Sequence, residues 1–411
     1  MKKIILLFLC AVFVISLSAC KKTETQGAGR ADVLSDKIVG DDSDTDDVQT
    51  LPEPEHITGR VSVAAVGDNI IYQAGLTDAK NRSDNGGYNF LPNYDNIREK
   101  IEGADVAFIN QETLVAGEEY GYSDYPRFNS PQSLVSDLIE VGFDVIGMAN
   151  NHMLDMGTNG LGDTIAYYKT RSDEVTMIGG YENEEDFMTP RVVEVNGIKI
   201  AFVAFTYATN GLKLASGSDI YVPYIDDADI ERSVAAAKEV ADCVILSMHW
   251  GEENNFDPIE DQRHAAQVAA DCGVLAIIGQ HPHVIQPIEW IEGKNGNKML
   301  CIYSLGDLIA VMMKASNMLG GLVTFDIVRD NDDFWIENTV FNPTVFHFGP
   351  SYYNGKLYYL SDFTDSLAST FGNVYGITAD REDLERIVKK TIDAEFLPDY
   401  LKEDGSAGVE E

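Results

Sequence analysis

Short apolar segments that end abruptly in polar side chains recur along this chain of 411 residues. Each has the length and the Val/Ile content of a strand buried on both faces, as in parallel sheets. Helix-like segments alternate with the later ones, which predicts an α/β fold. Five segments are followed by potential ligands: Val61–Val66 by Asp68, Asp105–Ile109 by Glu112, Asp144–Ala149 by Asn151 and His152, Cys243–Ser247 by His249, and Val274–Ile278 by His281 and His283.

The ends of parallel strands meet at one sheet edge, where α/β proteins place their functional groups. For the single stretch 142–157, GFDVIGMANNHMLDMG, a helix cap or an Asx turn is an equally good interpretation, because Asn and Asp favour both. Helix caps and Asx turns do not explain why acids and histidines follow five separate apolar segments. Mixed oxygen and imidazole donors suit Mn, Fe or Zn better than Ca. The pattern therefore predicts two divalent ions, which a bridging carboxylate would hold about 3.5 to 4 Å apart.

Other residues have plainer interpretations. His56, His264 and His347 lie in a polar tether, a predicted helix and an aromatic segment, and none is predicted to bind metal. An Asn196-Gly197 pair between two apolar runs predicts a β-hairpin. Three cysteines are expected to be small buried hydrophobes, with one disulfide left open: Cys243, Cys272 and Cys301. No glycine-rich phosphate loop and no G-x-S-x-G motif is present.

The N-terminus has the pattern of a bacterial lipoprotein signal peptide. Residues 1–19 contain two lysines, an apolar run and a small-residue cleavage site, and Cys20 follows directly. Lipidation of Cys20 would anchor the chain to the outer face of the cytoplasmic membrane. A plain signal peptide with an incidental cysteine is the alternative.

Residues 20–58 are predicted to be a disordered acidic tether, because they lack apolar periodicity and contain the run DDSDTDD. The formal net charge of the chain is -37. Removing residues 1–19 deletes Lys2 and Lys3 and brings the charge to -39 (-37 minus 2). Nucleic acid is therefore excluded as a partner, and a polyanionic substrate would be repelled unless cations intervene.

An ordered set of blocks resembles the CapA family of capsule synthesis proteins, named for poly-gamma-glutamate capsule formation. The blocks are GDNII, NQET, ANNHMLDMG, HWGEE and GQHPHVIQ, followed by YSLGD, and they run from about Val61 to Asp307, with a weaker resemblance to about Pro343. That family is related to the calcineurin-like metallophosphoesterases. The resemblance implies a four-layer α-β-β-α sandwich over residues 59–345, with a dinuclear site at its rim and a C-terminal extension and tail at residues 346–411.

The resemblance also implies roles for single residues. The first metal would be bound by Asp68 and His283, the second by Asn151, His249 and His281, and Glu112 would bridge them. His152 would be the catalytic acid and Asp155 would orient it. Trp250 and Glu253 would face the substrate or support the ligands. The same is expected of other polar residues in these blocks: Asn69, Asn110, Asn150 and Gln280.

Two positions depart from the family pattern. Phosphoesterases usually carry D-x-H in the first block, but Ile70 stands where that histidine is expected, so the first metal would lack an imidazole. The CapA block usually reads GHHPH, whereas position 280 is Gln, which would replace a substrate contact. Neither departure removes the H-x-H pair.

The function implied is a metal-dependent hydrolase or transferase in capsule or poly-gamma-glutamate synthesis, release or export. It would act on a phosphoester or a gamma-glutamyl amide, with the anionic polymer or capsule synthesis proteins as partners. One alternative is a non-catalytic lipoprotein that binds or anchors the polymer, and another is a solute-binding lipoprotein, which would leave the strand-end ligands unexplained. The aromatic segment after Pro343 either packs on the core or forms a rim for an extended substrate.

Overall fold

The computed structural model describes residues 56–312, 314–370 and 380–402, all within one compact unit, Glu55–Glu411. The predicted signal peptide, Cys20 and nearly all of the predicted tether lie outside the described residues. Strand β1 begins at Thr58, and His56 Nε2 lies 2.5 Å from Asp330 Oδ1. The folded chain therefore starts just before the predicted boundary at residue 59.

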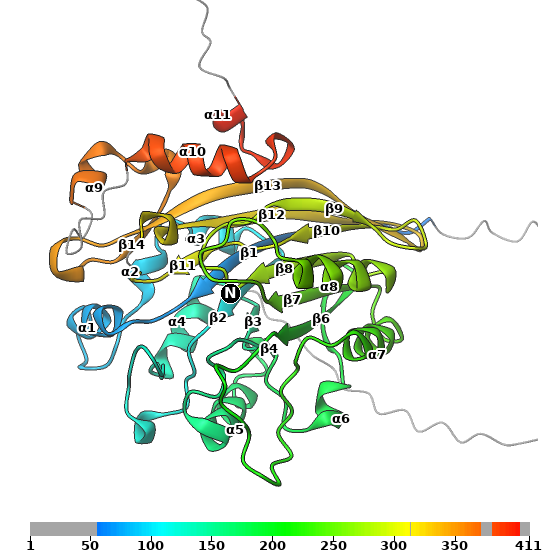
Figure 1. Cartoon of the computed structure of the whole chain (residues 1–411), viewed down its shortest axis with the longest axis horizontal. Helices are drawn as coiled ribbons and strands as arrows, with labels where there is room; N and C mark the ends of the chain where they lie inside the picture. The colour runs from blue at the N-terminus through cyan, green and yellow to red at the C-terminus, as the bar shows by residue number, and fades with distance from the viewer. Residues whose placement is uncertain (1–55, 313, 371–379, 403–411) are drawn as a thin grey trace, which may run out of the picture. The chain divides into compact units, whose positions relative to one another are not determined.

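Two sheets form the centre of the molecule (Figure 1). In the first, the order is β14-β13-β12-β1-β2-β3-β4, with β11 beside β1; in the second, it is β5-β6-β7-β8-β10-β9. The strands of the first sheet are β1 Thr58–Asn69, β2 Val106–Gln111, β3 Val145–Gly147, β4 Thr176–Ile178, β11 Asp307–Ile309, β12 Leu319–Asp330, β13 Asp333–His347 and β14 Lys356–Tyr359. Those of the second sheet are β5 Arg191–Val195, β6 Ile198–Thr206, β7 Cys243–His249, β8 Ala276–Gln280, β9 Ile288–Glu292 and β10 Lys298–Ile302.

Parallel pairing dominates the half of each sheet that carries the predicted ligands. Strands β1 to β4 pair in parallel, as do β6, β7, β8 and β10. The carboxyl ends of these strands therefore lie along common edges. The predicted hairpin is confirmed: β5 and β6 flank Asn196 and Gly197, which both have positive φ, at 51° and 75°. Such a pair matches the twist of the strands it joins.

Helices cover the outer faces of the sheets. The α-helices are α1 Gln73–Asn81, α2 Leu91–Tyr94, α3 Arg98–Glu102, α4 Ser133–Val141, α5 Gly157–Lys169, α6 Glu184–Phe187, α7 Asp227–Lys238, α8 Glu260–Asp271, α9 Asp365–Thr370, α10 Arg381–Thr391 and α11 Asp399–Lys402. Among the described residues, no helix is long and apolar enough to cross a membrane.

The side chains of the second sheet alternate between two hydrophobic cores, one on each face of the sheet. In β7, Ile245 belongs to the large core shared with the first sheet, whereas its neighbours Val244 and Leu246 pack with α7 and α8. Successive side chains of a strand point to opposite faces, so both faces are buried. The first sheet is covered in turn by α4 and α5, whose apolar residues join the large core. The predicted α/β, four-layer α-β-β-α fold is confirmed.

The C-terminal segment packs on this core. Strand β13 runs through the boundary predicted at residue 346, and β14 pairs with it at the edge of the first sheet. Leu357, Phe363 and Val388 are fully buried in the large core. Of the two interpretations of this segment, the structure supports packing over a substrate rim, because these apolar side chains face the interior.

The described cysteines form no disulfide. Cys243 and Cys301 are buried and Cys272 is half-buried, and all three are free. Their expected role as small hydrophobes fits these positions.

Candidate metal centre

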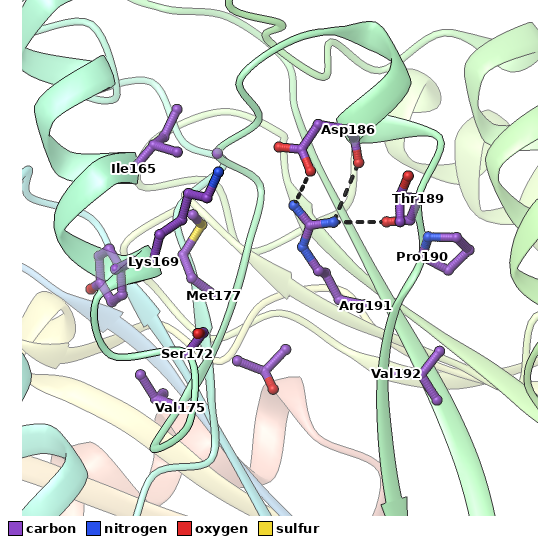
Figure 2. Close-up of a pocket in the computed structure, with 13 residues that line it drawn as sticks. Ile165, Lys169, Ser172, Val175, Met177, Asp186, Thr189, Pro190, Arg191 and Val192 are labelled. Carbon is purple, nitrogen blue, oxygen red and sulfur yellow. Dashed lines mark hydrogen bonds and ion pairs between the residues drawn. The ribbon is translucent and has the colours of Figure 1, made fainter. Parts of the chain in front are cut away.

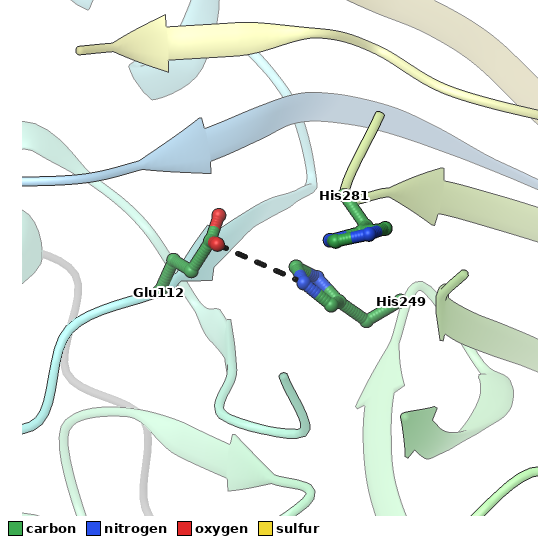
Figure 3. A group of neighbouring side chains, drawn as sticks. All are labelled: Glu112, His249 and His281. Atoms are coloured by element: carbon green, nitrogen blue, oxygen red, sulfur yellow. Dashed lines mark ion pairs between the residues drawn. The ribbon is translucent and has the colours of Figure 1, made fainter. Parts of the chain in front are cut away.

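Two groups of buried side chains could each hold a metal ion. One consists of Glu112, His249 and His281, and the other of Asp68, His283 and Asp307. Within each group the potential ligand atoms all lie within 4.8 Å of one another. Figure 3 shows the first group, with the carboxylate of Glu112 pointing toward His249 and the ring of His281 beside it. Five of these six residues are predicted ligands, divided as the family resemblance implies.

Strand ends bring the two groups together. Asp68 lies near the end of β1, directly opposite Asp307 at the start of β11. The backbones are very close here, because a Cβ on Gly67 would lie 1.9 Å from the carbonyl oxygen of Gly306. Only glycine tolerates such an approach. The Gly-Asp pairs at 67–68 and 306–307 thus place two carboxylates side by side.

The H-x-H segment follows β8 in a strained conformation. His281 and His283 have φ values of 98° and 55°, in a region that non-glycine residues rarely adopt. The backbone N–H of His281 donates to Asp68 Oδ2 at 3.0 Å, which ties the turn to β1. As a result the two imidazoles face different groups. Strain of this kind is characteristic of functional sites.

Glu112 lies between the two groups. Its Oε1 is 3.7 Å from His249 Nε2 and 3.9 Å from His283 Nε2. Both of its carboxylate oxygens are buried and lack a hydrogen-bond partner within the described part of the chain, as do Asp307 Oδ2 and His281 Nδ1. Buried polar atoms without partners are costly. Divalent ions would satisfy these atoms, so the residues present fit metal binding, and Glu112, which lies near an imidazole of each group, would be the residue able to bridge two ions.

Burial and mutual repulsion shift the pKa values in the centre. Burial, together with the negative charge of Asp68, raises the pKa of Glu112 well above its usual value. Burial lowers the pKa of His249 and of His281, and the neighbouring histidines add to this. Burial would also lower the pKa of His283, but Asp307 and Glu112 outweigh it and raise that pKa. The raised carboxyl pKa values mean that a bound cation would have to compete with protons for these oxygens.

A cavity of about 390 Å³ opens beside the metal centre, at the loop after β3. Its lining includes Asn151, His152, Asp155 and the exposed Glu253. His249 Nε2 donates to Asn151 Oδ1 at 2.9 Å, so Asn151 reaches the group of Glu112, His249 and His281. His152 Nδ1 lies 2.8 Å from Asp155 Oδ2, which also accepts from the Phe128 N–H at 2.7 Å. Asp155 thus contacts both the His152 ring and the backbone of the neighbouring loop.

Comparison with known proteins assigns the chain to a family. Residues 62–312, more than half of the chain, match the family model described as bacterial capsule synthesis protein PGA_cap. The chain belongs to this family. The resemblance to CapA proteins is therefore confirmed.

Two named relatives of this PGA_cap protein come from bacilli. It is 33% identical over 178 residues to the PGA biosynthesis protein CapA of Bacillus subtilis, which covers 43% of this chain and 44% of that protein. It is 32% identical over 187 residues to the capsule biosynthesis protein CapA of Bacillus anthracis, covering 44% of each. The chain spans less than half the length of these relatives.

Solved structures are similar at a lower level. The calcineurin-like phosphoesterase YfkN from Bacillus subtilis is 13% identical, with a TM-score of 0.38 over 81% of this chain and 97% of that one. A phosphatase from Mycoplasma pneumoniae is 14% identical, with a TM-score of 0.42 over 70% and 95%. Similarity this low says nothing about the substrate of this PGA_cap protein.

Asp307 is a ligand candidate that the sequence pattern did not single out. The block YSLGD contains it, but three residues and a tight turn separate it from the preceding apolar run, 299–303. The carboxylate of Asp307 lies 2.9 Å from His283 Nδ1. The group of Asp68 and His283 therefore has a third potential donor, Asp307, although Ile70 provides no imidazole and is buried against Phe128 and Ala310.

Two predicted substrate-facing residues lie elsewhere. The Trp250 side chain packs in the core under α8, where its Nε1 donates to the Tyr303 carbonyl at 2.9 Å. It follows His249 directly, so strand alternation turns it to the opposite face. Gln280 is fully buried, and its amide bonds to Ser247 and to the Ile278 carbonyl. Gln280 therefore braces the strands beneath His249 and does not form the expected substrate contact.

The three asparagines expected near the site support its ligands and loops. Asn110 donates to Asp68 Oδ1 at 2.6 Å, and its own Oδ1 is buried without a partner in the described part. Asn69 donates to Gln111 and accepts from the Tyr94 hydroxyl, next to Asp68 at the end of β1. Asn150 accepts from the His152 N–H at 3.0 Å and donates to the Gln111 carbonyl, so it shapes the turn that presents His152.

A separate pocket of about 360 Å³ lies between α5, β4 and β5 (Figure 2). It contains no residue of the metal groups. Its Arg191 is held by Asp186 Oδ1 at 2.6 Å and by the Thr189 carbonyl at 2.9 Å. The other cation of the lining, Lys169, pairs with Glu182 Oε2 at 2.7 Å. Both cations are therefore already paired, and the pocket is not part of the metal centre.

Metal binding should weaken as the pH falls through about 7. Burial raises the pKa of Asp307 to about 7, although His283 opposes the shift. A carboxylate with a raised pKa stays protonated to higher pH, and the proton must leave before a cation binds. Affinity should fall roughly tenfold per pH unit for each proton displaced. Competition with a chelator at several pH values measures this, and Asp307→Asn should flatten the dependence; a pH-independent affinity would contradict the assignment.

Proposed function

We propose that this PGA_cap protein is a metal-dependent hydrolase or transferase of capsule or poly-gamma-glutamate synthesis, release or export. The observation that carries this proposal is the buried, partnerless carboxylate of Glu112 between two groups of ligands, next to a cavity lined by His152 and Asp155. A phosphoester or a gamma-glutamyl amide is the bond proposed to be attacked. The names of the two CapA relatives support the link to the polymer.

The residues of the chain have distinct proposed roles. Asp68, His283 and Asp307 would hold one ion, while His249, His281 and Asn151 would hold the other, with Glu112 between them. Two such ions, when bound, lower the pKa of a water and stabilise developing negative charge. Manganese, iron or zinc suits these donors.

His152 is the proposed general acid. Its Nδ1 donates to Asp155, and Nε2 makes no hydrogen bond within the described residues, so Nε2 is the atom available to the cavity. The imidazolium would give its Nε2 proton to the leaving atom. Asp155 would keep the ring in the required orientation and stabilise its positive charge. Phe128 packs edge-on against the ring, with centroids 4.8 Å apart, and limits its rotation.

Metal analysis combined with release assays tests the proposed function. The full chain, purified in detergent, should contain metal and release product from an aryl phosphate or from polyglutamate. A chelator should abolish the release and added Mn or Zn should restore it. If metal is bound but neither substrate is turned over, the non-catalytic alternative, a lipoprotein that binds or anchors the polymer, is favoured.

We also propose that Cys20 is lipidated and holds the protein on the outer face of the cytoplasmic membrane, as the signal-like residues 1–19 indicate. Replacing Cys20 by serine should release the protein from membranes without loss of metal, because every described ligand lies at residue 68 or beyond. Fractionation of cells followed by metal analysis measures both effects. Membrane retention of the Cys20→Ser protein would refute lipid anchoring.

A further inference from the structure

The cavity beside His152 contains one positively charged side chain, that of Arg127, among the residues that line it. The other ionisable residues of the lining are His152, Asp155 and Glu253. Arg127 is exposed, and its guanidinium makes no hydrogen bond or ion pair with any residue that the structure describes. Although the chain carries a net charge of -37, no acidic side chain that the structure describes pairs with this guanidinium.

The backbone of Arg127 is fixed, although its side chain is free. Its N–H donates to the Asp124 carbonyl at 3.0 Å, and its carbonyl accepts from the Ser123 hydroxyl at 2.8 Å. The next residue, Phe128, donates its N–H to Asp155 and packs against His152. The loop that carries Arg127 is therefore attached directly to the proposed acid and to its orienting carboxylate. These contacts tie the backbone at Arg127 to the loop that carries His152.

The charged groups of the lining differ in whether they are free to bind a ligand. Asp155 already bonds to His152 and to a backbone N–H, whereas Arg127 and Glu253 remain open to a ligand. A negatively charged group would be attracted to the side of Arg127 and repelled from the side of Glu253. The fork of N–H donors on arginine matches the oxygens of carboxylate and phosphate.

We propose that Arg127 binds an anionic group, a carboxylate or a phosphate, on the part of the substrate that lies beside His152. This inference rests on the proposed function in calling the ligand a substrate, but binding of the anion does not require turnover. Arg127 would then determine specificity: it selects a leaving portion that carries a negative charge, which the acidic surface would otherwise repel. It would also orient that portion with its departing atom toward Nε2 of His152.

Matched probes test the inference on the full chain. The carboxylate probe is gamma-glutamylglutamate, with its fully amidated form as the neutral counterpart. The phosphate probe is glycerol phosphate, with glycerol as the counterpart. Dissociation constants are measured by calorimetry for the natural protein and for Arg127→Gln, Arg127→Lys and Lys213→Gln. Lys213 is the control, because it is exposed next to the cavity-lining Leu212 but does not line the cavity itself.

We expect Arg127→Gln to weaken one charged probe roughly 10- to 100-fold, the usual worth of a charge-assisted pair. The neutral counterpart should be unaffected, Arg127→Lys should retain part of the affinity, and Lys213→Gln should change nothing. The probe that responds identifies carboxylate or phosphate as the group bound. Any contribution from metal-bound phosphate is the same in all these proteins and does not affect the comparison.

Three outcomes would overturn the inference: equal binding of charged and neutral probes to the natural protein, no response to Arg127→Gln, or an equal loss in Lys213→Gln. The last would mean that only the general charge of the surface matters. Failure of the proposed function has a different signature. Charged probes would still bind through Arg127, while no phosphoester or polyglutamate is turned over.

Discussion

Replacing Glu112 by glutamine should remove about one equivalent of bound metal and lower turnover by roughly 1000-fold or more, since in the proposed function two bound ions would supply both the nucleophile and the charge stabilisation. Glutamine has the same shape but carries no charge, so it cannot bridge two cations. No other described carboxylate lies near imidazoles of both ligand groups and also has two partnerless oxygens. Metal content and release rate measured on the same preparation give both effects.

The same substitution should have opposite effects on stability with and without metal. Burial raises the pKa of Glu112 in the folded, metal-free protein. A raised carboxyl pKa contributes stability below its usual pKa, and that contribution is lost as the pH rises. Metal-free Glu112→Gln should therefore melt at a higher temperature than the metal-free natural protein, more so at pH about 8 than at about 5. With metal present, the natural protein should be the more stable.

A matched control distinguishes the loss of a metal ligand from the loss of one negative charge. Glu252 is exposed and belongs to neither ligand group, so Glu252→Gln removes the same charge without touching the centre. It should leave metal content, turnover and the order of melting temperatures unchanged. If Glu112→Gln keeps its full metal content, Glu112 is not a ligand and the dinuclear assignment is wrong.

Replacing His152 by alanine should leave both metals in place and lower the rate by roughly 100- to 10,000-fold, the usual worth of a positioned general acid. His152 is in neither ligand group, whereas its neighbour Asn151 contacts His249. Asn151→Ala should therefore lower metal occupancy instead. Loss of metal in Asn151→Ala and loss of rate with metal retained in His152→Ala would show that Asn151 is a ligand and His152 a proton donor.

The size of the His152 effect should depend on the leaving group. The leaving group of an activated aryl ester or anilide departs without needing a proton. His152→Ala should therefore lower the rate on such a substrate only slightly, and lower the rate on the alkyl counterpart by the full factor of roughly 100- to 10,000-fold. His264→Ala is the control, because that histidine is exposed and pairs with Asp227 outside the centre. Equal losses on both leaving groups, or loss of metal, would place His152 in the coordination sphere and leave the general acid unassigned.

The sequence by itself determined the fold class and most of the donors. Apolar runs of strand length followed by Asp68, Glu112, His249 and the H-x-H pair carry their information locally, because a buried strand must be apolar and a ligand must follow it. The lack of a histidine at position 70 is equally visible in the sequence. The two sheets confirm the expected fold class, and the described donors lie in two groups that could each hold an ion.

Only the tertiary structure decided which donors share an ion and which neighbours face away. Asp307 joins Asp68 because β11 pairs with β1 across more than half of the chain, and no local pattern encodes that pairing. Trp250 turns from the centre although His249 enters it, because alternate positions of a strand point to opposite faces. Arg127 gains its place beside His152 through the bond between Phe128 and Asp155, from loops far apart in sequence. Long-range packing sets these contacts, and local sequence does not contain it.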